Sequence, residues 1–304
     1  MIFINKNGSL DKIKEVDFKL EKEMQSLVEH NLNSLFSLKF LTTEFSIERY
    51  RFDTVAFNEE TNSFVILEYK RGRNESLVDQ GYAYLSTLLN HKADFVLLYN
   101  ECFGQSKSIK DFDWTQTRIY FVSTQFTDYQ KNATDFSNMP FVLYVIKQYA
   151  NGVFLVEEIE KIRSTKHEMI SFGDEQNSEI TKVKKEIIVY TEDTVLENGT
   201  ERTKELYENL KLRILELGHV TIVPRKLYIA FIGRKHICDI EVQKKKLIVT
   251  INIKQGDLKD PTGVATDVSA IGHWGNGDYQ VLVSEDEILD YLMTLIRQSY
   301  KLNS

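Results

Sequence analysis

The sequence predicts an α/β domain in the N-terminal half of the chain and a smaller α+β domain in the C-terminal half. Three observations support this prediction. In the N-terminal half, segments with helical periodicity alternate with strand-like segments. In the C-terminal half, several strand-like segments follow one helix and precede another. Residues 164–185, between the halves, are rich in Lys, Glu, Ser, Gln and Asn without clear periodicity, as in a linker. We therefore predict domains at residues 1–163 and 186–304.

The first expected element is a helix whose apolar residues fall on one face, and a later helix has the same pattern. Between them lie two segments rich in β-branched and aromatic residues, joined by the turn-forming residues 58–62. The expected helices are residues 20–36 and 75–91, and the expected strands are residues 50–57, 63–70, 93–99, 141–148 and 153–159.

Two acidic residues and a lysine are expected to converge on the hairpin formed by residues 50–70. If the hairpin is centred between Glu60 and Thr61, residues whose numbers sum to 121 face each other, and Asp53 lies opposite Glu68. The two-residue period of a strand places Lys70 on the face of Glu68. Facing carboxylates in a mostly apolar hairpin require a raised pKa or a bound cation.

This group of residues suits a divalent metal centre. Carboxylates supply the oxygen ligands that Mg²⁺ prefers, and a lysine beside the metal can position attacking water and stabilise transition-state charge. The alternative is a cross-sheet ion pair between Glu68 and Lys70, with Asp53 at a strand edge.

Side chains on the two expected helices add to this group. Glu29 lies at the rim of the apolar face of the first helix, from which it can lean into a site between helix and sheet. Gln80 and Tyr84 lie one turn apart on the second helix and share a face. The alternatives are a solvated helix surface for Glu29 and Gln80, and the core for Tyr84.

These residues together resemble the PD-(D/E)xK nuclease superfamily, in its RecB-like branch. The resemblance rests on Glu29, Asp53, Glu68-x-Lys70 and Gln80-x-x-x-Tyr84 and covers roughly residues 10–160. Phe52 stands where the family name has proline. The resemblance implies a restriction endonuclease-like fold with an αβββαβ core and a mixed sheet. It also implies Mg²⁺ or Mn²⁺ held by Asp53 and Glu68, in some members with Glu29, Lys70 near the attacking water, and Gln80 orienting the substrate or the lysine.

Composition limits the class of protein and its partners. The chain has 304 residues and 42% hydrophobic content, which suits about two globular domains. No signal-peptide pattern follows Met1 and no apolar run approaches the roughly 18 residues of a membrane span, so we expect a soluble, cytoplasmic protein. Cys102 and Cys238 lack zinc-ligand spacing and are expected to be ordinary thiols.

The formal net charge of −7 disfavours strong nonspecific adhesion to nucleic acid, so a nuclease needs a local basic patch. Lys70, Arg71 and Arg73, with Arg49 and Arg51 nearby, are candidates for it, and Arg71, Arg73 and Tyr84 are candidate substrate contacts. The alternative for this basic group is a solvated strand end.

The C-terminal half resembles an uncharacterised domain found behind such nuclease-like modules, in proteins often labelled predicted transport proteins. The resemblance covers roughly residues 185–303 and rests on segments 227–231, 239–246 and 272–279. The expected helices are residues 201–217 and 286–300, and the expected strands are residues 227–231, 236–242 and 247–253. The chain lacks a membrane span, so the transport label finds no support.

The glycines at 272, 275 and 277 do not follow a strand and open a helix, and they predict a hairpin in preference to a phosphate loop. Lys244 to Lys246 suit phosphate contact and His273-Trp274 suits base stacking, with a solvated turn and a packed tryptophan as alternatives.

The sequence therefore predicts a metal-dependent nuclease that cleaves nucleic acid, with DNA favoured, and whose C-terminal domain serves recognition. The alternative is a noncatalytic module that binds nucleic acid or a protein partner on the same scaffold. A homodimer stays open, and no membrane partner is expected.

Overall fold

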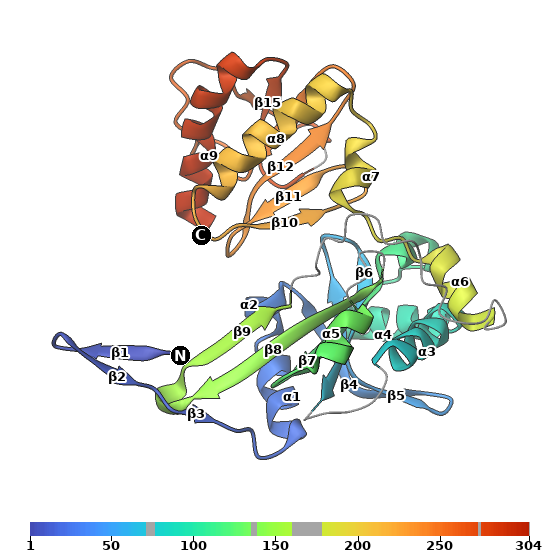
Figure 1. Ribbon diagram of the computed structural model, residues 1–304. Helices are drawn as coiled ribbons and strands as arrows, with labels where there is room; N and C mark the ends of the chain where they lie inside the picture. The colour runs from blue at the N-terminus through green and yellow to red at the C-terminus, as the bar shows by residue number, and fades with distance from the viewer. Residues whose placement is uncertain (71–76, 135–138, 160–177, 273–274, 304) are drawn as a thin grey trace. The chain divides into compact units, whose positions relative to one another are not determined.

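The computed structural model describes residues 1–70, 77–134, 139–159, 178–272 and 275–303 (Figure 1). The chain divides into two compact units, Met1–Val189 and Tyr190–Ser304. Each unit contains its own sheet and its own buried apolar core.

A mixed sheet forms the centre of the first unit, with strand order β3-β8-β7-β6-β5-β4 and β9 paired to β8. Strands β4, β5 and β6 are antiparallel neighbours, whereas β6, β7 and β8 run parallel. The strands are β3 (Glu15–Val16), β4 (Lys39–Ile47), β5 (Tyr50–Asn58), β6 (Ser63–Lys70), β7 (Arg118–Ser123), β8 (Phe141–Tyr149) and β9 (Phe154–Glu158). A separate hairpin precedes them, formed by β1 (Phe3–Lys6) and β2 (Ser9–Lys12).

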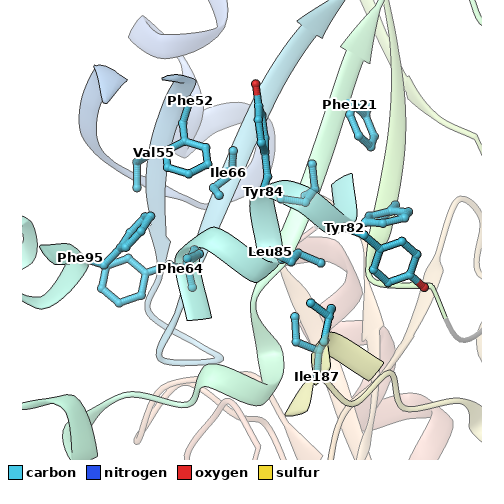
Figure 2. Packing of buried hydrophobic residues seen from close by; sticks show 14 of the residues in the cluster. Phe52, Val55, Phe64, Ile66, Tyr82, Tyr84, Leu85, Phe95, Phe121 and Ile187 are labelled. Carbon is cyan, nitrogen blue, oxygen red and sulfur yellow. The ribbon is translucent and has the colours of Figure 1, made fainter. Parts of the chain in front are cut away.

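Helices cover both faces of this sheet. Their bounds are α1 (Glu21–His30), α2 (Leu32–Phe36), α3 (Leu77–Asn90), α4 (Lys92–Phe103), α5 (Asp128–Thr134) and α6 (Ser178–Glu186). Short 3-10 helices occur at Ile109–Asp111, Trp114–Gln116 and Ala150–Gly152. Because strand side chains alternate, Phe64 and Ile66 of β6 pack in the core with α3 and α4 (Figure 2). Val65 and Leu67 pack on the other face with α1 and α2.

The register of the β5–β6 hairpin is as predicted. The paired residues run from Thr54 opposite Leu67 to Asn58 opposite Ser63, and the numbers of each pair sum to 121. Asp53 follows at the next position, where its Oδ2 atom accepts a hydrogen bond of 3.0 Å from the backbone N–H of Tyr69. The turn chemistry of residues 58–62 therefore sets the position at which Asp53 and Glu68 meet.

Three expectations for the first unit need correction. The expected strand at residues 93–99 is part of helix α4, because Phe95, Val96 and Tyr99 are buried at helical spacing while Leu97 is 57% exposed. A short apolar run is compatible with either structure, and here burial decides. The sequence does not predict strand β7, which pairs with β6. The expected helix at residues 20–36 is interrupted at Asn31, between α1 and α2.

The predicted linker also needs correction, because part of residues 164–185 belongs to α6. Val183 is buried on this helix, and Ile187, one turn later, is buried beyond its end. Both belong to the apolar cluster that contains Leu85 and Leu88 of α3. The mostly charged composition hid this narrow apolar stripe.

The second unit contains an antiparallel sheet with strand order β10-β11-β12-β13-β15-β14. Helices α8 and α9 contact its central strands, β12 and β13. The strands are β10 (Thr221–Pro224), β11 (Ile229–Ile232), β12 (His236–Val242), β13 (Leu247–Ile251), β14 (Thr266–Asp267) and β15 (Tyr279–Val283). The helices are α7 (Glu192–Leu196), α8 (Glu201–Leu215), a 3-10 turn (Asp286–Ile288) and α9 (Leu289–Asn303).

The glycine-rich segment connects β14 to β15, and Asn276 and Gly277 lie beside β12 and β13. Gly277 has a φ of +126°, and a Cβ atom there would lie 2.0 Å from the carbonyl oxygen of Ile251. The backbone N–H of the preceding Asn276 donates to the buried carboxylate of Asp239. His273 and Trp274 lie outside the described residues.

Gly81 allows α3 to approach the sheet closely, and we expect Gly81→Ala to destabilise the protein by about 1–3 kcal/mol. A Cβ atom at this position would lie 2.5 Å from the ring of Phe141 on β8. Overpacking should outweigh the gain in helix propensity and displace α3, which carries Gln80. Urea unfolding measures the loss. Gly272→Ala is the control, since a Cβ atom there would meet no atom of the described residues within 4 Å. Equal stability of the two variants would contradict this account of the packing.

Candidate active site

Four predicted site residues come together where β5, β6 and the start of α3 meet. Glu68 and Lys70 continue the face of β6 that carries Phe64 and Ile66 toward α3. Their side chains form an ion pair, with 2.8 Å between Lys70 Nζ and Glu68 Oε1. Gln80, in the first turn of α3, donates from Nε2 to the same oxygen at 2.7 Å.

Glu68 is buried, and its two carboxylate oxygens differ. Oε1 accepts the hydrogen bonds from Lys70 and Gln80. Oε2 is buried and has no hydrogen-bond partner among the described residues. Because a buried carboxylate oxygen is costly to leave without a partner, this atom marks a place where a ligand or a proton is needed.

Asp53 lies close enough to Glu68 for the two carboxyl groups to affect each other's titration. Burial raises the pKa of Glu68 to about 7, the negative charge of Asp53 adds to this, and Lys70 and Gln80 oppose it. Burial also raises the pKa of Asp53, against its hydrogen bond from the Tyr69 N–H and the charge of Lys70. The pair is therefore poorly stabilised in its fully ionised form and would be stabilised by a cation.

The donor set fits a hard divalent cation. Two carboxylates, one with an oxygen that lacks a partner among the described residues, provide the oxygen ligands that Mg²⁺ and Mn²⁺ favour. Because Mg²⁺ usually keeps several waters, two protein carboxylates can be a sufficient protein contribution.

Tyr84 supports the position of Gln80 from within the core. Its hydroxyl accepts a hydrogen bond of 3.0 Å from Gln80 Nε2 and donates one of 3.1 Å to the carbonyl oxygen of Arg51. Its ring packs edge-on against Phe52 in the apolar cluster, and Figure 2 shows the hydroxyl pointing out of that cluster. Tyr84 is buried, as in the core alternative, and its role as a substrate contact stays a prediction.

Glu29 does not lie with the carboxylates of Asp53 and Glu68. Its Oε1 atom accepts hydrogen bonds from Thr54 Oγ1 at 2.6 Å and from Gln25 Nε2 at 2.9 Å. Thr54 also contacts the hydroxyl of Tyr69, which packs with α1 and α2. Among the residues that the structure describes, no three His, Cys, Asp or Glu side chains lie close enough to hold one ion. The predicted three-carboxylate set is thus reduced to Asp53 and Glu68.

Gln25 is a site-supporting residue that the sequence did not reveal. Its amide Nε2 lies 2.8 Å from the carbonyl oxygen of Asp53 as well as bonding to Glu29. Gln25 is 5% exposed and stands between Met24 and Val28 on the buried side of α1. A polar residue on the buried face of an amphipathic helix is the signal that could have identified it.

The expected basic patch is described only in part. Arg71 and Arg73 lie outside the described residues. Arg51 is exposed, and its charge opposes the rise in the pKa of Asp53 that burial causes. Arg49 stacks on the ring of Tyr50.

A cavity elsewhere in the first unit, between α3 and α6, is lined by residues that include Ser86, Asn90, Lys182 and Glu186. It includes none of the candidate site residues.

Comparison with known proteins identifies the family of the chain. A Haemophilus influenzae protein described as an uncharacterized protein is 42% identical over 301 residues, which cover 99% of each chain. The protein belongs to the same family as this relative. Residues 192–303 also match the family model described as Domain of unknown function (DUF5655).

Two solved structures show partial similarity to this chain. A repair endonuclease from Pyrococcus abyssi is 21% identical, with 40% of this chain and 45% of that chain covered and a TM-score of 0.23. An EndoMS-dsDNA2 complex is also 21% identical, with 41% and 44% covered and a TM-score of 0.24. This chain therefore spans less than half the length of either of the two structures. The fold of the first unit is defined by its own strand order and register.

None of the helices in the described part of the chain combines the length and the apolarity that crossing a membrane requires.

Proposed function

We propose that this protein is a Mg²⁺- or Mn²⁺-dependent nuclease that hydrolyses phosphodiester bonds of DNA. The observation that carries the proposal is the buried Asp53–Glu68 pair, whose Glu68 Oε2 atom, without a partner among the described residues, lies in a group with Lys70 and Gln80. Such a pair is costly in an apolar hairpin unless it binds a cation or retains a proton.

The protein groups have separate roles in this proposal. Asp53 and Glu68 would hold the metal, which when bound would supply positive charge to the phosphate and lower the pKa of water. Lys70 stabilises negative charge as it develops on the phosphate and helps to position the attacking water. Gln80 orients the Glu68 carboxylate by its hydrogen bond to Oε1, and Tyr84 holds Gln80 in turn. Gln25 positions the backbone at Asp53, and Glu29 contributes to that support.

A noncatalytic binding module is the second candidate. It is favoured by the raised pKa of Glu68, because a carboxyl pair that shares a proton is stable without metal. In that case the Glu68–Lys70 ion pair is a structural contact only.

A cleavage assay separates the two candidates. Purified protein is incubated with labelled single- and double-stranded DNA and RNA, in Mg²⁺, Mn²⁺ or EDTA. We expect cleavage of DNA that requires the divalent ion, together with saturable Mg²⁺ or Mn²⁺ binding by calorimetry. Absence of both cleavage and metal binding across this panel would favour the noncatalytic module.

Gln80→Ala is expected to lower kcat by about ten- to a hundredfold while KM changes little. Gln80 orients a metal-binding carboxylate, so its loss should act mainly on the reacting complex. Steady-state kinetics on a short DNA duplex, at saturating Mg²⁺, measures the split. Gln105→Ala, an exposed glutamine on the same unit, is the control. An increase in KM with unchanged kcat would instead place Gln80 in the substrate groove.

A further inference from the structure

Two hairpin turns at one end of the second unit's sheet carry five basic residues. The turn between β10 and β11 contains Arg225 and Lys226, and the turn between β12 and β13 contains Lys244–Lys246. We call these residues the cationic turns. Alternate turns of an antiparallel meander lie at the same end of the sheet, and β11 pairs with β12. The two turns are therefore about two strand spacings, roughly 10 Å, apart.

The backbone of both turns is held in place. The Arg225 N–H donates to the carbonyl oxygen of Tyr228 at 2.8 Å, and the Gln243 N–H donates to that of Lys246 at 3.0 Å. The carbonyl oxygen of Lys244 also accepts a hydrogen bond of 3.1 Å from Thr200 Oγ1, at the N-terminus of α8. Binding at these turns would thus cost little backbone ordering.

The cations are available at the surface. Lys226, Lys244 and Lys245 are exposed. Within the described residues, Lys226 and Lys244–Lys246 take part in no ion pair with an acidic side chain. Some Lys and Arg side chains elsewhere in this unit do, as in the pairs of Lys211 with Glu192 and of Arg213 with Asp290.

Charge is also segregated along the sequence of this unit. Residues 225–246 contain seven basic and two acidic residues, and one of the acidic residues, Asp239, is buried. The remainder of residues 190–304 contains eight basic and fifteen acidic residues. Since the turns lie within about one Debye length of each other at 0.1 M salt, their potentials add. The five basic residues of the cationic turns are therefore close enough to act together on phosphate groups.

We propose that the cationic turns bind the sugar-phosphate backbone of the nucleic acid. This inference rests on the proposed function and assigns the contact with the substrate to named residues of the second unit. Lysine acts as a point charge toward phosphate and carries little base-sequence information, so the contact should be insensitive to sequence. An anionic membrane surface would favour exposed apolar side chains beside the lysines. No large apolar side chain in either turn, both of which lie within the described residues, is exposed.

The test measures binding of the full-length protein to a fluorescent DNA duplex by anisotropy, in EDTA, at several salt concentrations. The test variant combines Lys226→Ala, Lys244→Ala and Lys245→Ala. The matched control combines Arg234→Ala, Lys235→Ala and Lys254→Ala, three exposed cations at the opposite end of the same strands. Both variants change the net charge equally. Each variant is also made with glutamine in place of alanine. Thermal melting of all four proteins shows whether any of them has a folding defect.

We expect the slope of log K against log salt to fall by about two to three for the test variant and by less than one for the control. Equal changes in the two variants, or an unchanged slope in the test variant, would overturn the inference. The inference would also be overturned if binding of phosphatidylserine vesicles depended on the cationic turns and affinity for DNA did not.

Cleavage in Mg²⁺, measured separately, distinguishes this inference from the proposed function. Salt-dependent DNA binding through the turns without any cleavage would support the inference and contradict the nuclease. Cleavage by the test variant at unchanged affinity would do the reverse.

Discussion

Asp53→Ala and Glu68→Ala are each expected to reduce metal-dependent cleavage by at least about a thousandfold, with the fold intact. Each substitution removes one of the two carboxylates proposed to bind the cation, and such a loss is worth several kcal/mol of transition-state stabilisation. Cleavage rates at saturating Mg²⁺ and calorimetric Mg²⁺ binding measure the effect. Cleavage and Mg²⁺ binding should be lost together, because both require the same two carboxylates.

Three further variants make this result specific. Asp53→Asn and Glu68→Gln keep shape and remove charge, so they should also be inactive if charge is the essential property. Glu101→Ala removes an exposed carboxylate from α4 of the same unit and should cut like the parent protein. If purified Asp53→Ala or Glu68→Ala protein cuts as well as the parent, another centre is responsible for the activity.

The metal-free protein is expected to lose stability as pH rises from about 4.5 to about 7, through the titration of Glu68. Its pKa is 4.5 for the ordinary group and about 7 in the folded protein, so the folded state binds the proton more tightly. The contribution is therefore fully present below pH 4.5 and lost as pH rises through 7. It amounts to at most about 3 kcal/mol.

Urea unfolding in EDTA at pH 4.5 and pH 8, compared with Glu68→Gln, isolates this contribution. The other titrating groups are present in both proteins, so their contributions cancel in the comparison. The free energy of unfolding of the parent should therefore fall relative to that of Glu68→Gln as pH rises. Added Mg²⁺ should stabilise the parent more at pH 8 than at pH 4.5, since the ion competes with the proton for the carboxylates. A difference between parent and variant that does not change with pH, or Mg²⁺ stabilisation that is equal at both pH values, would contradict the coupling of Asp53 and Glu68 to a cation.

Features set by local chain geometry were predictable from the sequence. The turn residues 58–62 and the two-residue strand period determine the register in which Asp53 follows the pair of Thr54 and Leu67. The same period places Lys70 beside Glu68, and the 3.6-residue helical period places Gln80 beside Tyr84. These relations depend only on residues a few positions apart or on one short turn.

Other features depended on which surfaces pack together. The apolar run at residues 93–99 suits a strand or a helix, and burial of Phe95 and Tyr99 against the sheet selects the helix. By its sequence, Glu29 could lean into the site or lie on a solvated helix surface. The position of α1 over β5 directs it to Thr54 and Gln25, away from Asp53 and Glu68. These outcomes depend on contacts between segments far apart in the chain. The energies of such contacts cannot be read from a local sequence pattern. The sequence by itself therefore determined the Asp53, Glu68, Lys70 and Gln80 group, while tertiary packing decided which further residues join or support it.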